Sequence, residues 1–128
     1  DPDLAHNMGD WIAGCDICQE VCPHNSPRPG MTSEEPRASY RSGARSFDLL
    51  EVLNWDAKAR QEALKTSPLK RIKLEQFRRN AATAAGNALQ EHALPELRAR
   101  LTEIASDDSE PELVRRAASG ALGDRGCP

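Results

Sequence analysis

Aromatic and β-branched residues are scarce in this chain of 128 residues. Five aromatic residues, three Val, four Ile and four Thr compare with 18 Ala and 13 Leu. β-Branched and aromatic side chains pack the faces of β-sheets, whereas Ala and Leu are strong helix formers. No run approaches the roughly 18 consecutive apolar residues of a membrane-spanning helix, and a charged-then-apolar leader pattern is missing. The composition predicts an all-α fold in a cytoplasmic protein.

Cysteine is confined to two places. Cys15, Cys18 and Cys22 fall within eight residues and are followed by Pro23, while Cys127 stands alone. Clustered thiols in such a chain favour metal or redox chemistry over a disulfide framework. The spacing Cys-x2-Cys-x3-Cys-Pro matches the end of the bacterial ferredoxin run, whose last Cys binds a different cluster from its predecessors. The spacing therefore predicts Cys15, Cys18 and Cys22 as ligands of [4Fe–4S] clusters.

Three other interpretations of the cysteine run stay open. A structural zinc site needs four ligands, and only His6, His24 or Cys127 is available to complete the set. A redox-active Cys-x-x-Cys pair needs a preceding strand and a following helix, which the two nearby prolines disfavour. A third interpretation, in which the thiols are inert, requires no further ligand and no particular secondary structure. Cys127 itself is not expected to be a ligand.

Three thiolates cannot complete one four-Cys cluster if Cys22 serves a second cluster. The remaining ligands must then come from another part of the protein. The chain also begins at Asp1, and its first Met is Met8. We therefore expect the C-terminal part of a longer, two-cluster protein.

Three parts follow one another along the chain. Residues 1–30 are predicted to be the C-terminal piece of a 4Fe–4S ferredoxin-type domain, and residues 31–45 an irregular connection. Residues 46–128 are predicted to form a HEAT-like α-helical domain. Its helices are expected over 47–53, 57–65, 71–89, 95–104 and 109–122, with Ser46 and Asp56 as caps, Pro95 as a first residue and Gly123 as a stop.

An internal similarity supports the repeat. Residues 78–87 and 115–124 share five identities in ten at an offset of 37 residues. That offset suits a two-helix repeat of the HEAT type, although it is slightly short of the usual length. Small residues allow stacked helices to approach closely, which would explain the excess of Ala. Two unrelated Ala-rich helices are the alternative.

Charge is strongly segregated along the helical part. Six bases and one acid lie between Lys65 and Arg79, whereas seven acids and two bases lie between Glu91 and Glu112. A basic helix face can follow a phosphate backbone, and Arg37, Arg41 and Arg45 would extend it. A solvated helix face is the alternative. Phe77 is expected in the core, and the scattered His6, His24 and His92 do not form a catalytic site.

Several motifs together resemble one family, the epoxyqueuosine reductases. They are the block Met8 to Pro23 with its Gly-Cys-Asp-x-Cys-Gln-x-Val-Cys-Pro core, Phe47-Asp48-Leu49-Leu50 with Asn54-Trp55, and Arg71 followed by Arg79-Asn80-Ala81-Ala82 and Gly86-Asn87. The resemblance covers nearly the whole chain from Met8 onward and concerns the C-terminal part of that family.

The resemblance implies a function. Members of the family are cytoplasmic, cobalamin-dependent enzymes with two [4Fe–4S] clusters, and they reduce epoxyqueuosine to queuosine in the anticodon loop of tRNA. Cys15 and Cys18 would bind the cluster nearer the cobalamin, Cys22 would complete the other, and Asp16 would lie near the corrinoid. The partners implied are tRNA and an electron donor protein, with the enzyme acting as a monomer. Candidates for tRNA contact are Lys70, Arg71, Arg78, Arg79 and Asn80.

The chain also departs from the family pattern. The cobalamin-binding domain, the catalytic acid and the first four-Cys run of the family are absent from these 128 residues. We therefore expect no catalytic residue here, two clusters that this chain ligates only in part, and an isolated chain without activity. The competing hypothesis is a helical-repeat binding module whose cysteine segment is vestigial or holds zinc.

Overall fold

The computed structural model describes residues 2–14, 18, 21–24 and 46–123. These residues contain helices and no strand, which confirms the all-α prediction. The chain forms two compact units, one made of residues 1–13 with 48–128 and the other of residues 14–47. The sequence predicted a boundary at residue 30, whereas the structure groups the first 13 residues with the helices. Residues 31–45 lie outside the described residues, as do 15–17, 19–20 and 25–30 of the ferredoxin-type piece, and both assignments stay predictions.

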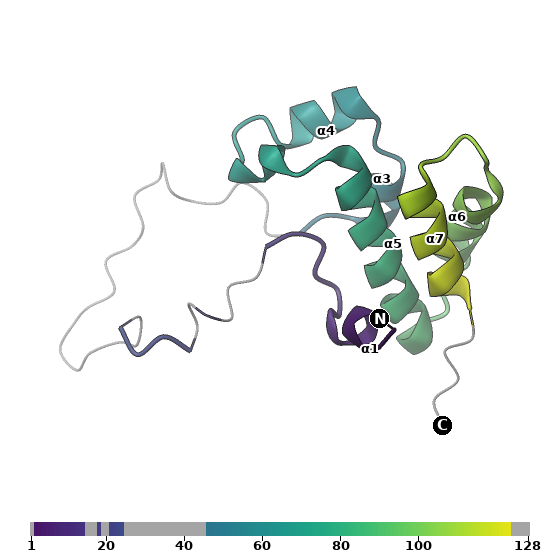
Figure 1. Cartoon of the computed structure of the whole chain (residues 1–128), viewed down its shortest axis with the longest axis horizontal. Coiled ribbons are helices and arrows are strands. Elements are labelled where there is room, and N and C mark those ends of the chain that lie inside the picture. Colours follow the sequence, from purple (N-terminus) through teal and green to yellow (C-terminus); the bar gives the residue numbers. More distant parts are fainter. Residues whose placement is uncertain (1, 15–17, 19–20, 25–45, 124–128) are drawn as a thin grey trace. The chain divides into compact units, whose positions relative to one another are not determined.

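Seven helical segments are described, and Figure 1 shows their arrangement. They are α1 (Pro2–Asn7), α3 (Leu49–Leu53), α4 (Ala57–Ala63), the 3-10 helix η2 (Pro68–Arg71), α5 (Leu74–Glu91), α6 (Pro95–Ser106) and α7 (Glu112–Leu122). The sequence predicted the five helices from α3 to α7, with ends displaced by a few residues. It did not predict α1 or η2.

Local chemistry explains where most of these helices begin and end. The Asp56 carboxylate accepts a hydrogen bond from Ala59 N at 2.7 Å, as predicted for a cap of α4. At α3 the cap is Asp48, which accepts from Glu51 N at 2.8 Å, so the prediction of Ser46 was wrong. Pro95 is the first residue of α6, and Gly123 ends α7 with its N–H donating to Ser119 O at 3.0 Å.

The core lies where α5 meets its neighbours. Helix α5 packs along α7, α6 packs against α7, and α3 covers parts of both α5 and α6. Phe77 is fully buried, as predicted, and its ring meets that of Trp55 edge-on with centroids 5.8 Å apart. The other large side chains that are completely enclosed are Val52, Leu53, Leu64, Leu101, Ile104 and Val114.

Small residues set the closeness of α5 and α7. A Cβ atom built on Gly86 would lie 2.7 Å from the Cβ of Ala121 and 2.8 Å from its Cα. The two segments that resemble each other in sequence therefore lie on helices that pack together. Helix α3 also packs on α5 and α6 on α7, while the assignment to stacked two-helix repeats of the HEAT type stays a prediction. Within the described part of the chain, no helix is both long and apolar enough to cross a membrane.

Candidate functional site

Two of the three clustered thiols are described. Cys18 is exposed and Cys22 is half-buried, and both are free cysteines. Thiolates are the ligands that iron–sulfur clusters use, so the donor chemistry fits such a group. Cys15 and Asp16 lie outside the described residues, as does Cys127. Over the described ranges, no three His, Cys, Asp or Glu side chains gather into a possible metal site.

The segment before the cysteines is held by α5. Asn87 Nδ2 donates to the backbone carbonyls of Ala5 at 2.9 Å and Gly9 at 2.8 Å. Asn80 Nδ2 donates to the carbonyl of Ile12 at 2.8 Å. Since Asn80 and Asn87 are seven residues apart, they lie two turns apart on one face of α5. This docking brings the N-terminal residues into the helical unit.

Sequence reasoning did not find this role for the asparagines. It placed Asn80 among the tRNA contacts and named Asn87 only within a family motif. The signal was available in the spacing, because two Asn seven residues apart on an otherwise Ala-rich helix share a face. The sequence does not indicate which backbone groups the two asparagines contact.

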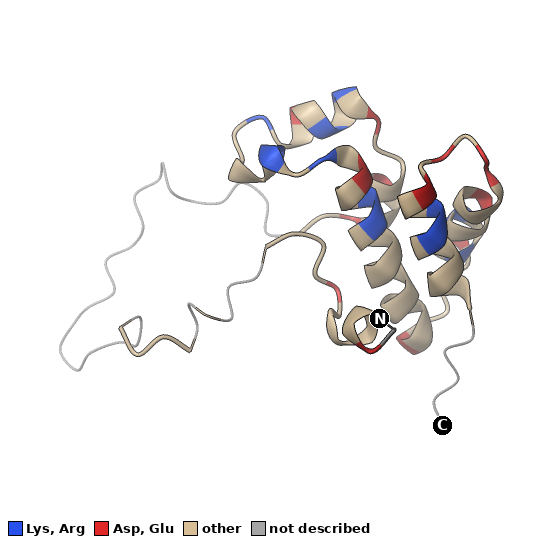
Figure 2. Cartoon of the chain, in the orientation of Figure 1, with Lys and Arg blue, Asp and Glu red and all other residues tan. Residues whose placement is uncertain are grey.

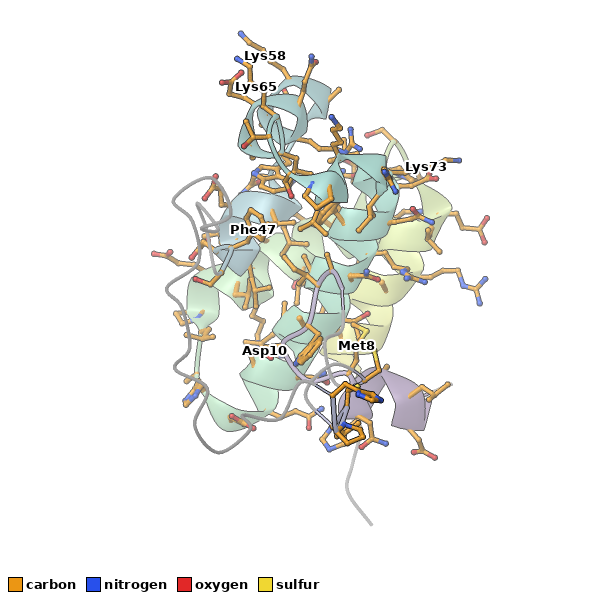
Figure 3. The ribbon with its side chains drawn as sticks, turned by 90° about the vertical axis from the view of Figure 1, so that its left-hand side faces the viewer. Met8, Asp10, Phe47, Lys58, Lys65 and Lys73 are labelled. Atoms are coloured by element: carbon orange, nitrogen blue, oxygen red, sulfur yellow. The ribbon has the colours of Figure 1, made fainter. Side chains whose placement is uncertain are left out.

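Most of the predicted basic residues are exposed. Of the six bases between Lys65 and Arg79, five are exposed: Lys65, Lys70, Arg71, Lys73 and Arg79. Lys58 on α4 is a further exposed cation. Figure 2 shows the basic positions of α4, η2 and the first turns of α5 on the same side of the helical unit. In Figure 3, Lys58 and Lys65 lie at one end of that unit, and Met8 and Asp10 lie toward the other. Arg37, Arg41 and Arg45 lie outside the described residues.

Helix η2 is fastened to α4 by a single arginine. Arg60 Nε donates to the Ile72 carbonyl at 3.0 Å, and Arg60 Nη2 donates to the Lys70 carbonyl at 2.5 Å. These bonds satisfy carbonyls at the end of a four-residue helix that would be unstable alone. Arg60 thereby fixes the backbone from which Lys70 and Arg71 project. It is a supporting residue of the basic surface rather than a member of it.

Arg78 differs from the other predicted tRNA contacts because it is buried. Its guanidinium makes two parallel bonds of 2.6 Å to the Glu110 carboxylate, and Nε donates to the Leu53 carbonyl at 3.0 Å. The two side chains are only 10% and 13% exposed. Arg78 thus links α3, α5 and the α6–α7 connection, and it is not part of the exposed basic surface.

The α6–α7 connection that carries Glu110 has a local structure of its own. Asp107 Oδ1 accepts bonds from the Ser109 hydroxyl at 2.6 Å and from Ser109 N at 2.8 Å. The hydroxyl bond first, and then the backbone bond, lowers the pKa of Asp107 below its ordinary value. Figure 2 shows several acidic positions along this connection and at the start of α7.

Several known proteins similar in sequence share one name. A relative from Alicycliphilus denitrificans, called epoxyqueuosine reductase, is 34% identical over 125 residues, which is 94% of this chain and 34% of the relative. Relatives of the same name from Prochlorococcus marinus and a Synechococcus strain are 43% and 42% identical over 77 residues. The chain belongs to the epoxyqueuosine reductase family. It spans about a quarter to a third of the length of these relatives. No family model and no solved structure matches the chain.

Membership of the epoxyqueuosine reductase family gives the motifs a context. The Arg-Asn-Ala-Ala and Gly-Asn motifs on α5 have a physical explanation in this fold. Asn80 and Asn87 bind the backbone of the N-terminal segment, and Gly86 allows α7 to pack closely against α5. The exposed Arg79 holds Asn80 in place, since Nε and Nη2 donate to Asn80 Oδ1 at 2.9 and 2.6 Å. Of the predicted tRNA contacts, Lys70, Arg71 and Arg79 present charge at the surface.

Proposed function

We propose that this chain is the part of an epoxyqueuosine reductase that supplies cluster ligands and a tRNA-binding surface. The enzyme as a whole would reduce epoxyqueuosine to queuosine in the anticodon loop of tRNA, in the cytoplasm. The observation that carries the proposal is the similarity to reductases of that name over 94% of the chain, cysteine run included.

The proposed chemistry is a reduction. Removing an epoxide oxygen as water consumes two electrons and two protons, and an electron donor protein would deliver the electrons one at a time through the clusters. Cys15 and Cys18 would hold the cluster nearer the corrinoid, and Cys22 would complete the second cluster. Cobalamin would supply the reductive chemistry at the epoxide and would be bound mainly by other parts of the enzyme, with Asp16 near it. This chain contributes ligands and no catalytic residue.

Iron content tests the ligand assignment. Because three clustered thiolates cannot complete two four-Cys clusters, we expect the isolated chain to retain well below the eight irons of two [4Fe–4S] clusters. Iron and sulfide are to be measured after anaerobic reconstitution, with the triple variant Cys15→Ser, Cys18→Ser, Cys22→Ser as the control. The control is expected to hold no iron.

Three results would contradict this part of the proposal. About eight irons per isolated chain would show that the ligand set is complete without the rest of the enzyme. A stable zinc-loaded chain that takes up no iron would favour the helical-repeat binding module instead. Isolated chain that reduces epoxyqueuosine would overturn the expectation of inactivity.

The surface proposed to bind tRNA is the basic end of the helical unit. Lys70 and Arg71 on η2, Lys73 before α5 and Lys65 after α4 are all exposed. Lys65 has one weak competitor, Glu62 at 3.8 Å, in a pair that is mostly exposed. Cations of this kind bind phosphate by releasing counterions, without reading sequence. Such a surface would hold the tRNA backbone and leave recognition of the base to the active site.

Charge reversal on η2 tests the tRNA surface. In the reductase that contains this chain, Lys70→Glu with Arg71→Glu is expected to weaken tRNA binding about tenfold or more at low salt. Loss of two phosphate contacts would also flatten the plot of log K against log salt by about 1.4 to 1.8. The matched control is Arg98→Glu with Arg116→Glu, two exposed arginines of α6 and α7. Equal affinity and slope in both double variants would remove this surface from the proposal.

A further inference from the structure

Helix α1 depends on contacts with α5. It has six residues, Pro2–Asn7, and a helix this short is unstable on its own in water. The last carbonyls of any helix lack partners within it. In α1, Leu4 O accepts from Met8 N at 3.1 Å and His6 O accepts from Gly9 N at 3.2 Å. The carbonyl of Ala5 takes its bond from α5.

Asn87 acts as a cap supplied by another helix. One amide group reaches the carbonyl of Ala5 inside α1 and that of Gly9 just beyond it. Gly9 has a φ of 59°, a conformation that favours glycine, and this turn brings its carbonyl to the same amide. Asn87 Oδ1 has no hydrogen-bond partner within the described part of the protein. Asn87 therefore acts in this fold as a hydrogen-bond donor through Nδ2.

Asn80 repeats the contact two turns earlier on α5. Its amide N–H donates to Ile12 O, and its Oδ1 accepts from the Arg79 guanidinium. Because Arg79 binds Oδ1 of Asn80, the Nδ2 of the same side chain is directed toward the Ile12 carbonyl. The Ile12 residue is itself 9% exposed and belongs to the core. Ile12 is also the third residue before Cys15.

We infer that Asn80 and Asn87 are positioning residues for the cluster-ligand segment. By donating to four backbone carbonyls, those of Ala5, His6, Gly9 and Ile12, they fix the end of the chain from which the cysteine run starts. The inference rests on the proposed function, since it concerns the cluster that Cys15 and Cys18 would bind. It assigns α5 a role in setting the geometry at the cluster, separate from any contact with tRNA.

Isosteric substitutions test the inference. Asn80→Asp keeps the oxygen that Arg79 holds and removes only the donor to Ile12, and Asn87→Asp removes both donors. In the reductase that contains this chain, we expect hydrogen exchange at Met8, Gly9 and Trp11 to accelerate about tenfold or more in either variant. We also expect the electron paramagnetic resonance spectrum or the midpoint potential of the reduced cluster to change. The control is Gln90→Ala, which removes an exposed amide side chain from the same helix.

The outcomes separate the inference from the proposed function. Faster exchange together with an altered cluster signal, with exchange within residues 81–86 of α5 unchanged, would support the positioning role. Faster exchange with a spectrum and potential equal to those of the Gln90→Ala control would overturn it, as would unchanged exchange. A parent enzyme that binds no iron would contradict the proposed function itself, and the inference would fall with it.

Discussion

Replacing Arg78 by Met is expected to lower the free energy of unfolding by about 3–5 kcal/mol. The substitution leaves the Glu110 carboxylate buried without its two short bonds and leaves the Leu53 carbonyl without a donor. A second cation, Arg100, lies 3.9 Å from Glu110 and also pairs with Glu103 at 3.0 Å. Urea unfolding followed by circular dichroism measures the loss. A domain of this size has about 5–15 kcal/mol in total, so the variant would be close to unfolding.

Two further variants test the cause of this loss. Arg78→Met with Glu110→Leu removes both charges, and we expect the pair to be much less destabilising than the sum of its single variants. Asp108→Ala breaks the ion pair with Arg115, but Asp108 is 97% exposed, and the expected loss is below about 1 kcal/mol. If Arg78→Met proved no more damaging than Asp108→Ala, burial would not be what makes the Arg78 pair important.

The burial of Arg78 also affects how tRNA binding is to be tested. Charge reversal at Arg78 together with Arg79 would place a carboxylate against Glu110 and disturb the fold. Weaker binding by such a variant would therefore not identify a tRNA contact. Lys70 and Arg71 are exposed, and their side chains can be reversed without breaking a buried interaction.

Substituting Gly86 by Ala is expected to destabilise the protein by about 1–3 kcal/mol, although Ala is the better helix former by about 1 kcal/mol. The new Cβ would lie 2.7 Å from the Cβ of Ala121, 2.8 Å from its Cα and 3.3 Å from its carbonyl oxygen. Two of these atoms are backbone, so α5 and α7 must move apart. Gly86→Val would require a larger displacement and have a larger effect. Thermal unfolding by circular dichroism gives the change.

Gly120 provides a control of opposite sign. It also lies inside a helix, α7, but a Cβ built there meets nothing within 4 Å. Gly120→Ala is therefore expected to stabilise the protein by about 0.5–1 kcal/mol through helix propensity alone. If Gly86→Ala were stabilising to the same degree, the close approach of α5 and α7 would not be needed by the fold.

Much of the local structure was predictable because it depends on neighbours in sequence. The excess of Ala and Leu predicted the helices, Asp56 its cap, Pro95 a helix start and Gly123 a helix end. The displaced cap at α3 has the same kind of cause: Asp48 lies directly before Leu49, whereas Ser46 lies two residues too early. Spacing also predicts the cysteine run to hold clusters, because cluster ligands close to one another in sequence keep a fixed pattern, and this stays a prediction.

Only the tertiary structure decided what the residues of α5 face. Arg78, Arg79 and Asn80 are consecutive, and the family resemblance placed all three among the candidate tRNA contacts. The helix turns by about 100° per residue, so the three side chains point in different directions. Arg78 meets Glu110, 32 residues away, and Asn80 meets Ile12, 68 residues away. The sequence determined the helices and predicted the cysteines as ligands, whereas long-range packing determined which polar residues support the fold and which are exposed.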